Sequence, residues 1–403
     1  MNLQVTRDGF SAHIEPVIAV NPCDPRHLLV ACRVFTGSRI GVAAYTSHDG
    51  GSAWQAMGKL PGLVPDACGN ATVSFDPSGN AYVCAVQASG TTRQGDALVW
   101  RLAAGEDRFR APVTAIPGDG GLADHPWTGV GARPGTPHAV LYVVGRLYGT
   151  DADGLVLTRS LDGGRTFEPP RPLDPAAGPQ ASSPVLAAAG HGSLSVAFTT
   201  PASSGGLAVR VLSSTDYGVT FGPAQILAEV EETAPDLSPL SARSGPALTA
   251  LPGGRGFCAA VTTFDEANGT SRLLTATGSG RGRWEPAVEA AAGTDTVYLQ
   301  PQIAAGADGR LAVTVYALDL RTHLIEVLLF RTPTGRSVVS ALRFLPPVKI
   351  TSAPFDPLKA VGTGATPWLG NYQGLAAGLH DDVHPVWTDT RSGSAQICTV
   401  APD

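Results

Sequence analysis

Lysine and long apolar segments are the scarcest features of this chain of 403 residues. Lysine occurs only at Lys59, Lys349 and Lys359, among 28 basic residues in all, and the formal net charge is −6 at pH 7. Because no basic run is present, a nucleic-acid partner or an anionic membrane surface is not expected. Because no apolar stretch is long enough to span a bilayer, a membrane protein is not expected either. Usage that is poor in lysine and rich in arginine is typical of a GC-rich bacterial genome.

Cysteine pairs with metal-ligand spacing are also absent. The six cysteines are scattered and form no CxxC motif, so we expect buried free thiols, with disulfides as the alternative, and neither a metal site nor a cofactor. The first nine residues contain no charged segment followed by an apolar one, so no signal peptide is expected. A cytoplasmic protein is therefore favoured over the mature form of a secreted one, and the oligomeric state stays open.

Glycine and proline, by contrast, are abundant. The chain has 48 Gly and 33 Pro without a collagen-like period, and its apolar segments are short and bounded by turn residues. Such a composition predicts an all-β fold rather than a disordered chain.

A turn motif with the pattern Ser-x-Asp-x-Gly-x-Thr-aromatic recurs along the chain. It is complete at residues 160–167, and related copies occupy residues 47–54 and 214–221. In this pattern the Ser and Asp side chains accept hydrogen bonds from the turn backbone, and glycine allows a positive φ. We therefore expect each copy to form the turn of a β-hairpin, with degenerate copies at residues 277–284 and 332–336.

Short apolar strands repeat in register with these turns. Seven units begin near residues 16, 71, 126, 184, 246, 301 and 373. Each unit holds a second, longer apolar strand, a third that leads into the turn and a fourth that leaves it, which is the pattern of a propeller blade. We predict a single β-propeller domain over residues 1–403 with seven four-stranded blades, the last completed by residues 2–6. Six blades with an insertion is the alternative, because the last spacing is the longest.

The turn motif resembles the Asp-box, or BNR, repeat of sialidases and related β-propellers. Residues 368–376 and 386–391 are similar to the closing blade of bacterial sialidase-like proteins. The resemblance implies a site at the mouth of the central channel, on the face opposite the Asp-box turns. In sialidases three arginines hold the sugar carboxylate, a tyrosine assisted by a glutamate is the nucleophile, and an aspartate transfers the proton. The Phe/Tyr-Arg-Ile-Pro motif that carries the first of those arginines is absent, and the nearest segment here is 32–35.

Candidate site residues lie just before the first strand and just after the second strand of each unit. The candidates for proton transfer are Glu15 and Asp124, and those for a nucleophile are Tyr298 and Tyr372. The candidates for binding a glycan or another small molecule are Arg33, His125, Arg146, Arg243, Arg321, Asp389 and Arg391. Arginine suits an anionic group through its planar fork, and paired carboxylates suit glycoside hydrolysis. The structural alternative is that these Asp and Arg residues tie neighbouring loops together, as Asp389 and Arg391 would in the closing blade.

Three functions are compatible with these residues. The first is a glycan-processing hydrolase of sialidase-like architecture with its site at the channel mouth. The second is a non-catalytic propeller that binds a glycan or a protein. The third is a propeller enzyme of the cyclase or lyase type that acts on a small molecule in a biosynthetic pathway, which the absence of a signal peptide favours.

Overall fold

The structure is a computed structural model that describes residues 2–149, 153–203, 205–231, 245–333, 342–360, 362–363, 366–378 and 382–402. Within these ranges the chain is built almost entirely of β-strands. The helical elements of this part of the chain are three short 3₁₀ turns, η1 (Pro175–Gln180), η2 (Pro252–Gly254) and η3 (Pro357–Lys359). No helix in the described ranges is both long enough and apolar enough to cross a membrane.

Strands that follow one another in sequence pair as antiparallel sheets. The first sheet holds β2 (Ala12–Asn21), β3 (Asp24–Thr36), β4 (Arg39–Ser47) and β5 (Gln55–Lys59). The next four strands are β6 (Gly69–Phe75), β7 (Ala81–Ala88), β8 (Gly95–Leu102) and β9 (Val113–Ile116). They share an eight-stranded sheet with β10 (Leu122–Gly131), β11 (Val140–Tyr148), β12 (Gly154–Ser160) and β13 (Arg171–Pro172). One residue pair, Leu122 with Gly95, joins these two groups of four.

The same arrangement continues to the end of the chain. The third sheet along the chain is four-stranded and holds β14 (Ser182–Ala188), β15 (Leu194–Pro201), β16 (Leu207–Ser214) and β17 (Gln225–Val230). The next holds β18 (Ala247–Leu251), β19 (Gly256–Asp265), β20 (Thr270–Ser279) and β21 (Val288–Thr294). It is followed by the sheet of β22 (Thr296–Ala305), β23 (Leu311–Asp319), β24 (Ile325–Arg331) and β25 (Val348–Lys349). A final four-stranded sheet holds β28 (Gly374–Ala377), β29 (Val383–Asp389), β30 (Gln396–Val400) and β1 (Asn2–Gln4). Separately, β26 (Gly362–Thr363) pairs with β27 (Thr366–Pro367). The prediction of an all-β fold with four-stranded antiparallel sheets is confirmed.

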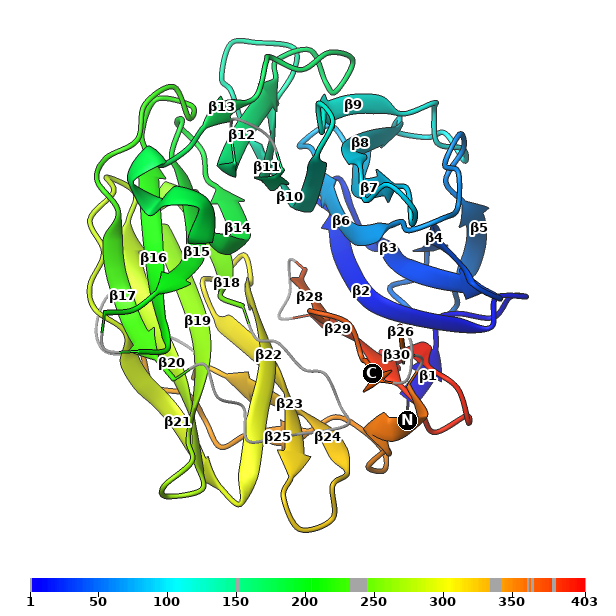
Figure 1. Cartoon of the computed structure of the whole chain (residues 1–403), viewed down its shortest axis with the longest axis vertical. Coiled ribbons are helices and arrows are strands. Elements are labelled where there is room, and N and C mark those ends of the chain that lie inside the picture. The colour runs from blue at the N-terminus through cyan, green and yellow to red at the C-terminus, as the bar shows by residue number, and fades with distance from the viewer. Residues whose placement is uncertain are drawn as a thin grey trace.

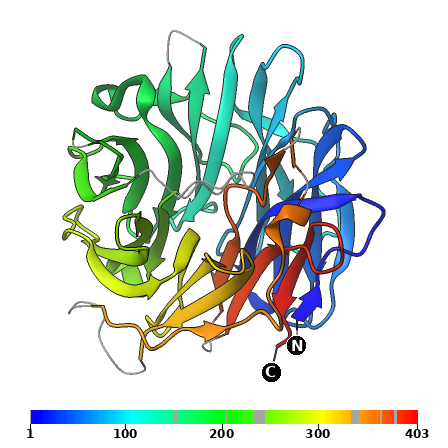
Figure 2. The same ribbon diagram turned by 60° about the horizontal axis from the view of Figure 1, so that its bottom comes forward.

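The sheets stand around a common centre, with the first strand of each group of four innermost (Figure 1). Neighbouring inner strands contact each other in the order β2, β6, β10, β14, β18, β22 and β28, and β28 in turn contacts β2. Strand β1 lies beside β30, so the two ends of the chain meet in one sheet (Figure 2).

Apolar side chains between adjacent sheets form the core. One cluster between β2–β5 and β6–β8 contains the buried residues Val42, Val83 and Trp100. The indole of Trp100 donates a hydrogen bond to the carbonyl of Pro61 at 2.8 Å, which satisfies its one polar group. All six cysteines are free thiols, and Cys23 is exposed rather than buried as expected.

The three turns at residues 47–54, 160–167 and 214–221, called here the aspartate turns, share one hydrogen-bond pattern. Ser160 Oγ accepts from the N–H of Gly164 at 2.8 Å, and Asp162 Oδ1 accepts from the N–H of Thr166 at 3.0 Å. The other two turns repeat both bonds. Gly164 has a φ of 77°, a conformation that favours glycine. The degenerate copy expected at residues 332–336 lies only partly within the described ranges.

Candidate functional site

Five of the inner strands carry a bulge at the same place. The strand register shifts between Ile14 and Val17 in β2, and at the equivalent points of β6, β10, β14 and β22. The residue inside each bulge has a φ between 47° and 56°: these residues are Glu15, Asn70, His125, Ser183 and Gln300. Proline follows four of the five, and because proline has no N–H to donate, the ladder is interrupted there.

These five residues are called here the bulge ring, because they lie on five of the inner strands that contact one another around the common centre of the sheets. A non-glycine residue with positive φ costs on the order of 1–3 kcal/mol, and such residues concentrate at binding and catalytic sites. A bulge also redirects the side chain that it carries. The same strained position therefore recurs on five inner strands, which belong to four sheets.

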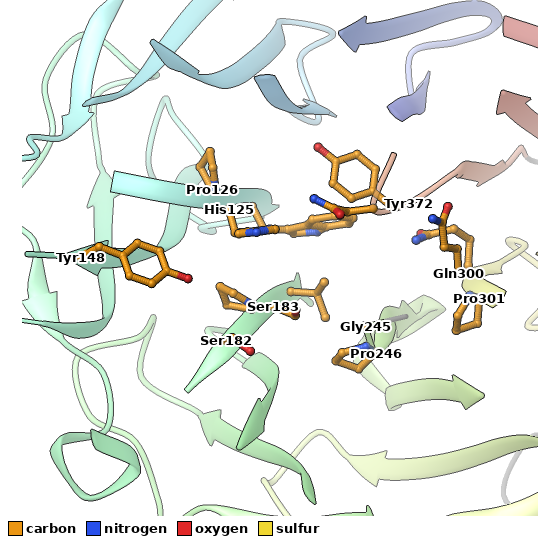
Figure 3. Close-up of a pocket in the computed structure, with 15 residues that line it drawn as sticks. His125, Pro126, Tyr148, Ser182, Ser183, Gly245, Pro246, Gln300, Pro301 and Tyr372 are labelled. Atoms are coloured by element: carbon orange, nitrogen blue, oxygen red, sulfur yellow. The ribbon is translucent and has the colours of Figure 1, made fainter. Parts of the chain in front are cut away.

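A pocket that is partly open to solvent lies against three residues of the bulge ring. Its walls include His125 and Trp127 from β10, Ser183 from β14 and Gln300 from β22. Figure 3 shows His125, Ser183 and Gln300 around a common space, with the hydroxyl of Tyr148 directed toward Ser183. The remaining lining residues are Pro126, Ser182, Pro184, Val185, Gly245, Pro246, Pro301, Gln302, Asn371 and Tyr372.

A line of polar contacts connects two of the predicted carboxylates behind this pocket. Glu15, whose side chain is 0% exposed, lies 3.3 Å from Nε of Arg33. Arg33 approaches Asn70 Oδ1 at 3.5 Å, and Asn70 Nδ2 donates to Asp124 Oδ1 at 2.5 Å. Asp124 also accepts from the N–H of His125 at 2.8 Å, and its other oxygen lies 3.8 Å from His125 Nε2. The Asp124 side chain is 25% exposed and reaches solvent, whereas the Glu15 side chain does not.

The segment 368–373 forms the pocket wall beside β22. Glu15 Oε1 accepts from the N–H of Asn371 at 2.9 Å, and Gln300 Nε2 donates to the carbonyl of Gly370 at 2.5 Å. Gln373 Nε2 donates to the carbonyl of Gln300 at 2.9 Å. The segment is thus hydrogen-bonded to β2 through Glu15 and to β22 through Gln300.

Tyr372 closes the pocket with its ring rather than with its hydroxyl. The ring meets Trp127 edge-on at 5.7 Å between centroids, and the hydroxyl donates to the carbonyl of Ala71 at 3.2 Å. Burial and the nearby charge of Glu15 raise the pKa of the Tyr372 phenol well above its usual value, against the opposing effect of Arg33. In this arrangement the phenolate that a nucleophilic tyrosine needs is disfavoured.

The structure thus brings together Glu15, Arg33, Asp124, His125 and Tyr372. Other predicted residues lie elsewhere. Tyr298 packs its ring against Phe330 in the core and does not line the pocket. Arg321 forms an exposed ion pair with Asp295.

Arg146, Asp389 and Arg391 have structural contacts. Arg146 is buried, forms an ion pair with Asp153 at 2.5 Å and lies over the ring of Tyr148. Asp389 accepts from the indole of Trp387 at 2.9 Å and pairs with Arg391 at 2.6 Å.

Arg391 also donates to Ser352 and Asn2, so this pair braces the last sheet. Arg243 lies outside the described residues.

Asn70 and Tyr148 are pocket or network residues that the sequence interpretation missed. Asn70 occupies the position in its repeat that Glu15 occupies before Pro16, so aligning the repeats residue by residue would have found it. Tyr148 ends β11 and carries no such signal. Among the described residues, no three His, Cys, Asp or Glu side chains are grouped to hold a metal ion.

Comparisons with known proteins identify similar folds but assign no role to the residues of the site. No family model and no curated protein matches the sequence. An α-L-arabinofuranosidase mutant from Fusarium graminearum, solved with an iminosugar inhibitor, matches at a TM-score of 0.51 and 10% identity, over 99% of this chain and 96% of that one. The α-L-arabinanase of Penicillium chrysogenum has a TM-score of 0.49 at 14% identity, over 80% and 99%. The NanB sialidase of Streptococcus pneumoniae has 0.48 at 13%, over 98% and 70%. The first of these similarities shows a shared fold.

Proposed function

We propose that this chain is a glycan-processing hydrolase whose site is the pocket at the mouth of the central channel. The observation that carries the proposal is the partly exposed carboxylate of Asp124, which is fixed by Asn70 and lies 3.8 Å from the imidazole of the lining residue His125. A carboxylate and an imidazole held together beside a polar, aromatic-lined pocket are suited to the proton transfers of glycoside hydrolysis. The fold shared with an α-L-arabinofuranosidase supports the same class of substrate.

The proposed reaction uses Asp124 and His125 as partners. Protonated His125 gives its proton to the glycosidic oxygen as the bond from the anomeric carbon to that oxygen breaks. The Asp124 carboxylate accepts a proton from the water molecule whose oxygen forms the new bond to the anomeric carbon. The proton then returns from Asp124 to His125, which lie 3.8 Å apart, and both groups regain their starting states. Glu15 is a positioning residue in this scheme, since it holds Arg33 and Asn371.

A non-catalytic glycan-binding propeller is the second candidate function. It is favoured by the burial of Glu15, because glycoside hydrolysis ordinarily uses two carboxyl groups at the substrate, and here one is enclosed in an ion pair. In that case the pocket would bind a saccharide without cleaving it.

Turnover of a panel of fluorogenic glycosides, sialosides included, tests the proposal. Asp124→Asn should lower kcat/KM on any hydrolysed glycoside by about a hundredfold or more, the scale of general acid–base catalysis. Asp107→Asn, which alters an exposed carboxylate on the loop between β8 and β9, is the matched control and should leave the rate unchanged. Equal rates for the wild type and Asp124→Asn would contradict the assignment. Binding of a saccharide without turnover of any glycoside would favour the second candidate.

We also propose that the architecture is one closed propeller domain of seven blades over residues 1–403. The proposal is supported by the seven groups of four strands and by the contact of β28 with β2, which follows the same order as the other inner strands. The pairing of β1 with β30 joins the two ends of the chain in the last blade. Six blades with an insertion would leave one of these groups of strands without a place.

A further inference from the structure

We propose that the pocket selects uncharged saccharides and discriminates against sugars that carry a carboxylate. This inference rests on the proposed glycan site and names its substrate class. The many candidate arginines in the sequence suggest the opposite preference, namely for an anionic sugar.

The described lining of the pocket contains no side chain that is permanently charged. Its polar side chains are the hydroxyls of Tyr148, Ser182 and Ser183, the amides of Gln300, Gln302 and Asn371, and the imidazole of His125; Tyr372 contributes its ring, because its hydroxyl donates to the carbonyl of Ala71. Amides and hydroxyls both donate and accept hydrogen bonds, which matches the hydroxyl groups of a sugar. Recognition of a carboxylate, in contrast, is best achieved by a guanidinium fork, and none of the described lining residues supplies one.

Two arginines of the described residues, Arg33 and Arg146, lie beside this group of residues, and the charge of each is already compensated. Arg146 lies 4.3 Å from the centroid of the Tyr148 ring and pairs with Asp153.

Arg33 is paired in the same way. Its Nε lies 3.3 Å from the carboxylate of Glu15, and its guanidinium lies 4.8 Å from the centroid of the Trp368 ring. A carbon added at Gly69 would lie 1.8 Å from an Arg33 nitrogen, so the backbone also confines the guanidinium. A ligand carboxylate would have to compete with Glu15 for this cation, at the cost of leaving a buried carboxylate unpaired.

Asp124 adds a negative charge beside the pocket, directly before the lining residue His125. It receives hydrogen bonds from Asn70 and from the N–H of His125. These bonds are made by neutral donors, so they fix the carboxylate without cancelling its charge. A ligand carboxylate in the pocket would be repelled by this group, whereas a neutral sugar would not.

The test compares methyl glycosides that differ in one carboxylate. Binding of methyl glucoside and methyl galactoside is measured by saturation-transfer NMR against the corresponding methyl uronides, with methyl arabinofuranoside and a methyl sialoside added. The neutral member of a pair should bind at least about tenfold more tightly, which corresponds to about 1.4 kcal/mol. Ser183→Arg places a guanidinium in the pocket and should reduce or reverse this preference by a similar factor. Ser78→Arg adds the same charge on the exposed turn between β6 and β7 and should leave the preference unchanged.

Either of two results overturns the inference: a uronide or the sialoside binds wild type as tightly as the neutral glycosides, or none of the neutral glycosides binds. If neutral glycosides bind but no fluorogenic glycoside is turned over, the inference stands and the proposed hydrolysis fails. The two proposals are therefore separated by the two measurements.

Discussion

Glu15 shows how a single residue in the bulge ring links several parts of the site. Its side chain is 0% exposed, lies 3.3 Å from Arg33 and accepts the N–H of Asn371. A carboxylate in this position joins β2 to β3 and to segment 368–373, and it is not exposed to solvent. The sequence pattern of a carboxylate before Pro16 is thus compatible with a buried bulge residue of β2 as well as with a catalytic group.

Glu15→Gln should destabilise the protein. Arg33 would be left as a buried cation without its partner, and breaking such a pair costs about 3–5 kcal/mol. Urea unfolding measures the loss. The double variant Glu15→Gln with Arg33→Met should recover part of it, because the uncompensated charge is then gone. A single variant within about 0.5 kcal/mol of wild type, the range of ordinary surface changes, would show that the pair has no such role.

Gly370→Ala tests how closely segment 368–373 approaches Glu15. Gly370 has a φ of +101°, and an added Cβ would lie 2.2 Å from Cγ of Glu15. Gly393 has a similar φ of +93° with no atom within 4 Å of an added Cβ, so Gly393→Ala isolates the conformational cost. We expect Gly370→Ala to lose about 1–3 kcal/mol more than Gly393→Ala in urea unfolding, from overpacking. Equal losses would mean that the segment moves away freely.

For individual residues, the sequence predicted which side chains occur near the site better than it predicted what each side chain does. Asp124 and His125 were predicted because they precede the expected first strand of their unit; the structure places both inside β10, and His125 lines the pocket. Arg146 and Arg391 were predicted because they follow expected second strands, yet their guanidinium groups are occupied by Asp153 and Asp389. Which of several equivalent side chains is already paired depends on contacts between distant parts of the chain, and no local pattern records that.

The aspartate turns are the elements in which sequence and structure correspond most directly. In the second turn, burial raises the pKa of Asp162, but hydrogen bonds from Thr166 and Ser160 and from the turn backbone outweigh it and lower the pKa to about 2. Thr166 Oγ1 contributes a bond of 2.6 Å to Oδ2 of Asp162. In the first turn Ala53 stands at the position of that threonine, so Asp49 lacks this bond.

Ala53→Thr should therefore stabilise the first turn. A new hydrogen bond from the threonine hydroxyl to Asp49 is expected to add about 0.5–1.5 kcal/mol in urea unfolding at neutral pH. Ala53→Val, which has nearly the same shape but no hydroxyl, is the matched control and should show no such gain. Equal stabilities for the two variants would refute the proposed bond.

The gain should also depend on pH with a definite sign. Hydrogen bonds, first among them the one from the N–H of Ala53, already lower the pKa of Asp49, and the new bond should lower it further. A carboxyl group whose pKa is lower in the folded protein contributes stability above its unfolded pKa of about 3.9. This contribution disappears as the pH falls through the folded pKa. The difference between the Thr and Val variants should therefore be full at neutral pH and shrink in acid, and a constant difference would contradict this origin.

For the whole molecule, the prediction of the fold rested mostly on the regular repeat of strands and turns along the sequence. Repeated short strands and turns were sufficient to predict four-stranded antiparallel sheets, because each sheet is local in sequence. The pocket is not local, since His125, Ser183 and Gln300 come from three different sheets. The bulges that aim these residues were not recognised, although proline after four of the five positions was visible in the sequence.

Deletion of residues 1–6 tests the proposed closure of the ring. β1 pairs with β30, Val5 is buried, and the N–H of Ile397 donates to Thr6 Oγ1 at 3.0 Å. Loss of the Val5 contacts alone should cost about 1.5–3 kcal/mol, and β30 would become an exposed edge. We expect a lower Tm and faster proteolysis near residues 396–400. Unchanged stability would show that the N-terminal strand does not close the propeller.

The most direct test of the glycan site is the NMR response of His125 to a bound sugar. His125 lines the pocket, whereas His138 and His191 do not. With the nine histidines labelled in their rings and His125 assigned from a His125→Gln variant, the tightest-binding neutral methyl glycoside is titrated to saturation. The account predicts that the His125 resonance shifts while those of His138 and His191 stay in place. A saturated sugar complex in which His125 does not shift would place the site elsewhere and contradict the central claim.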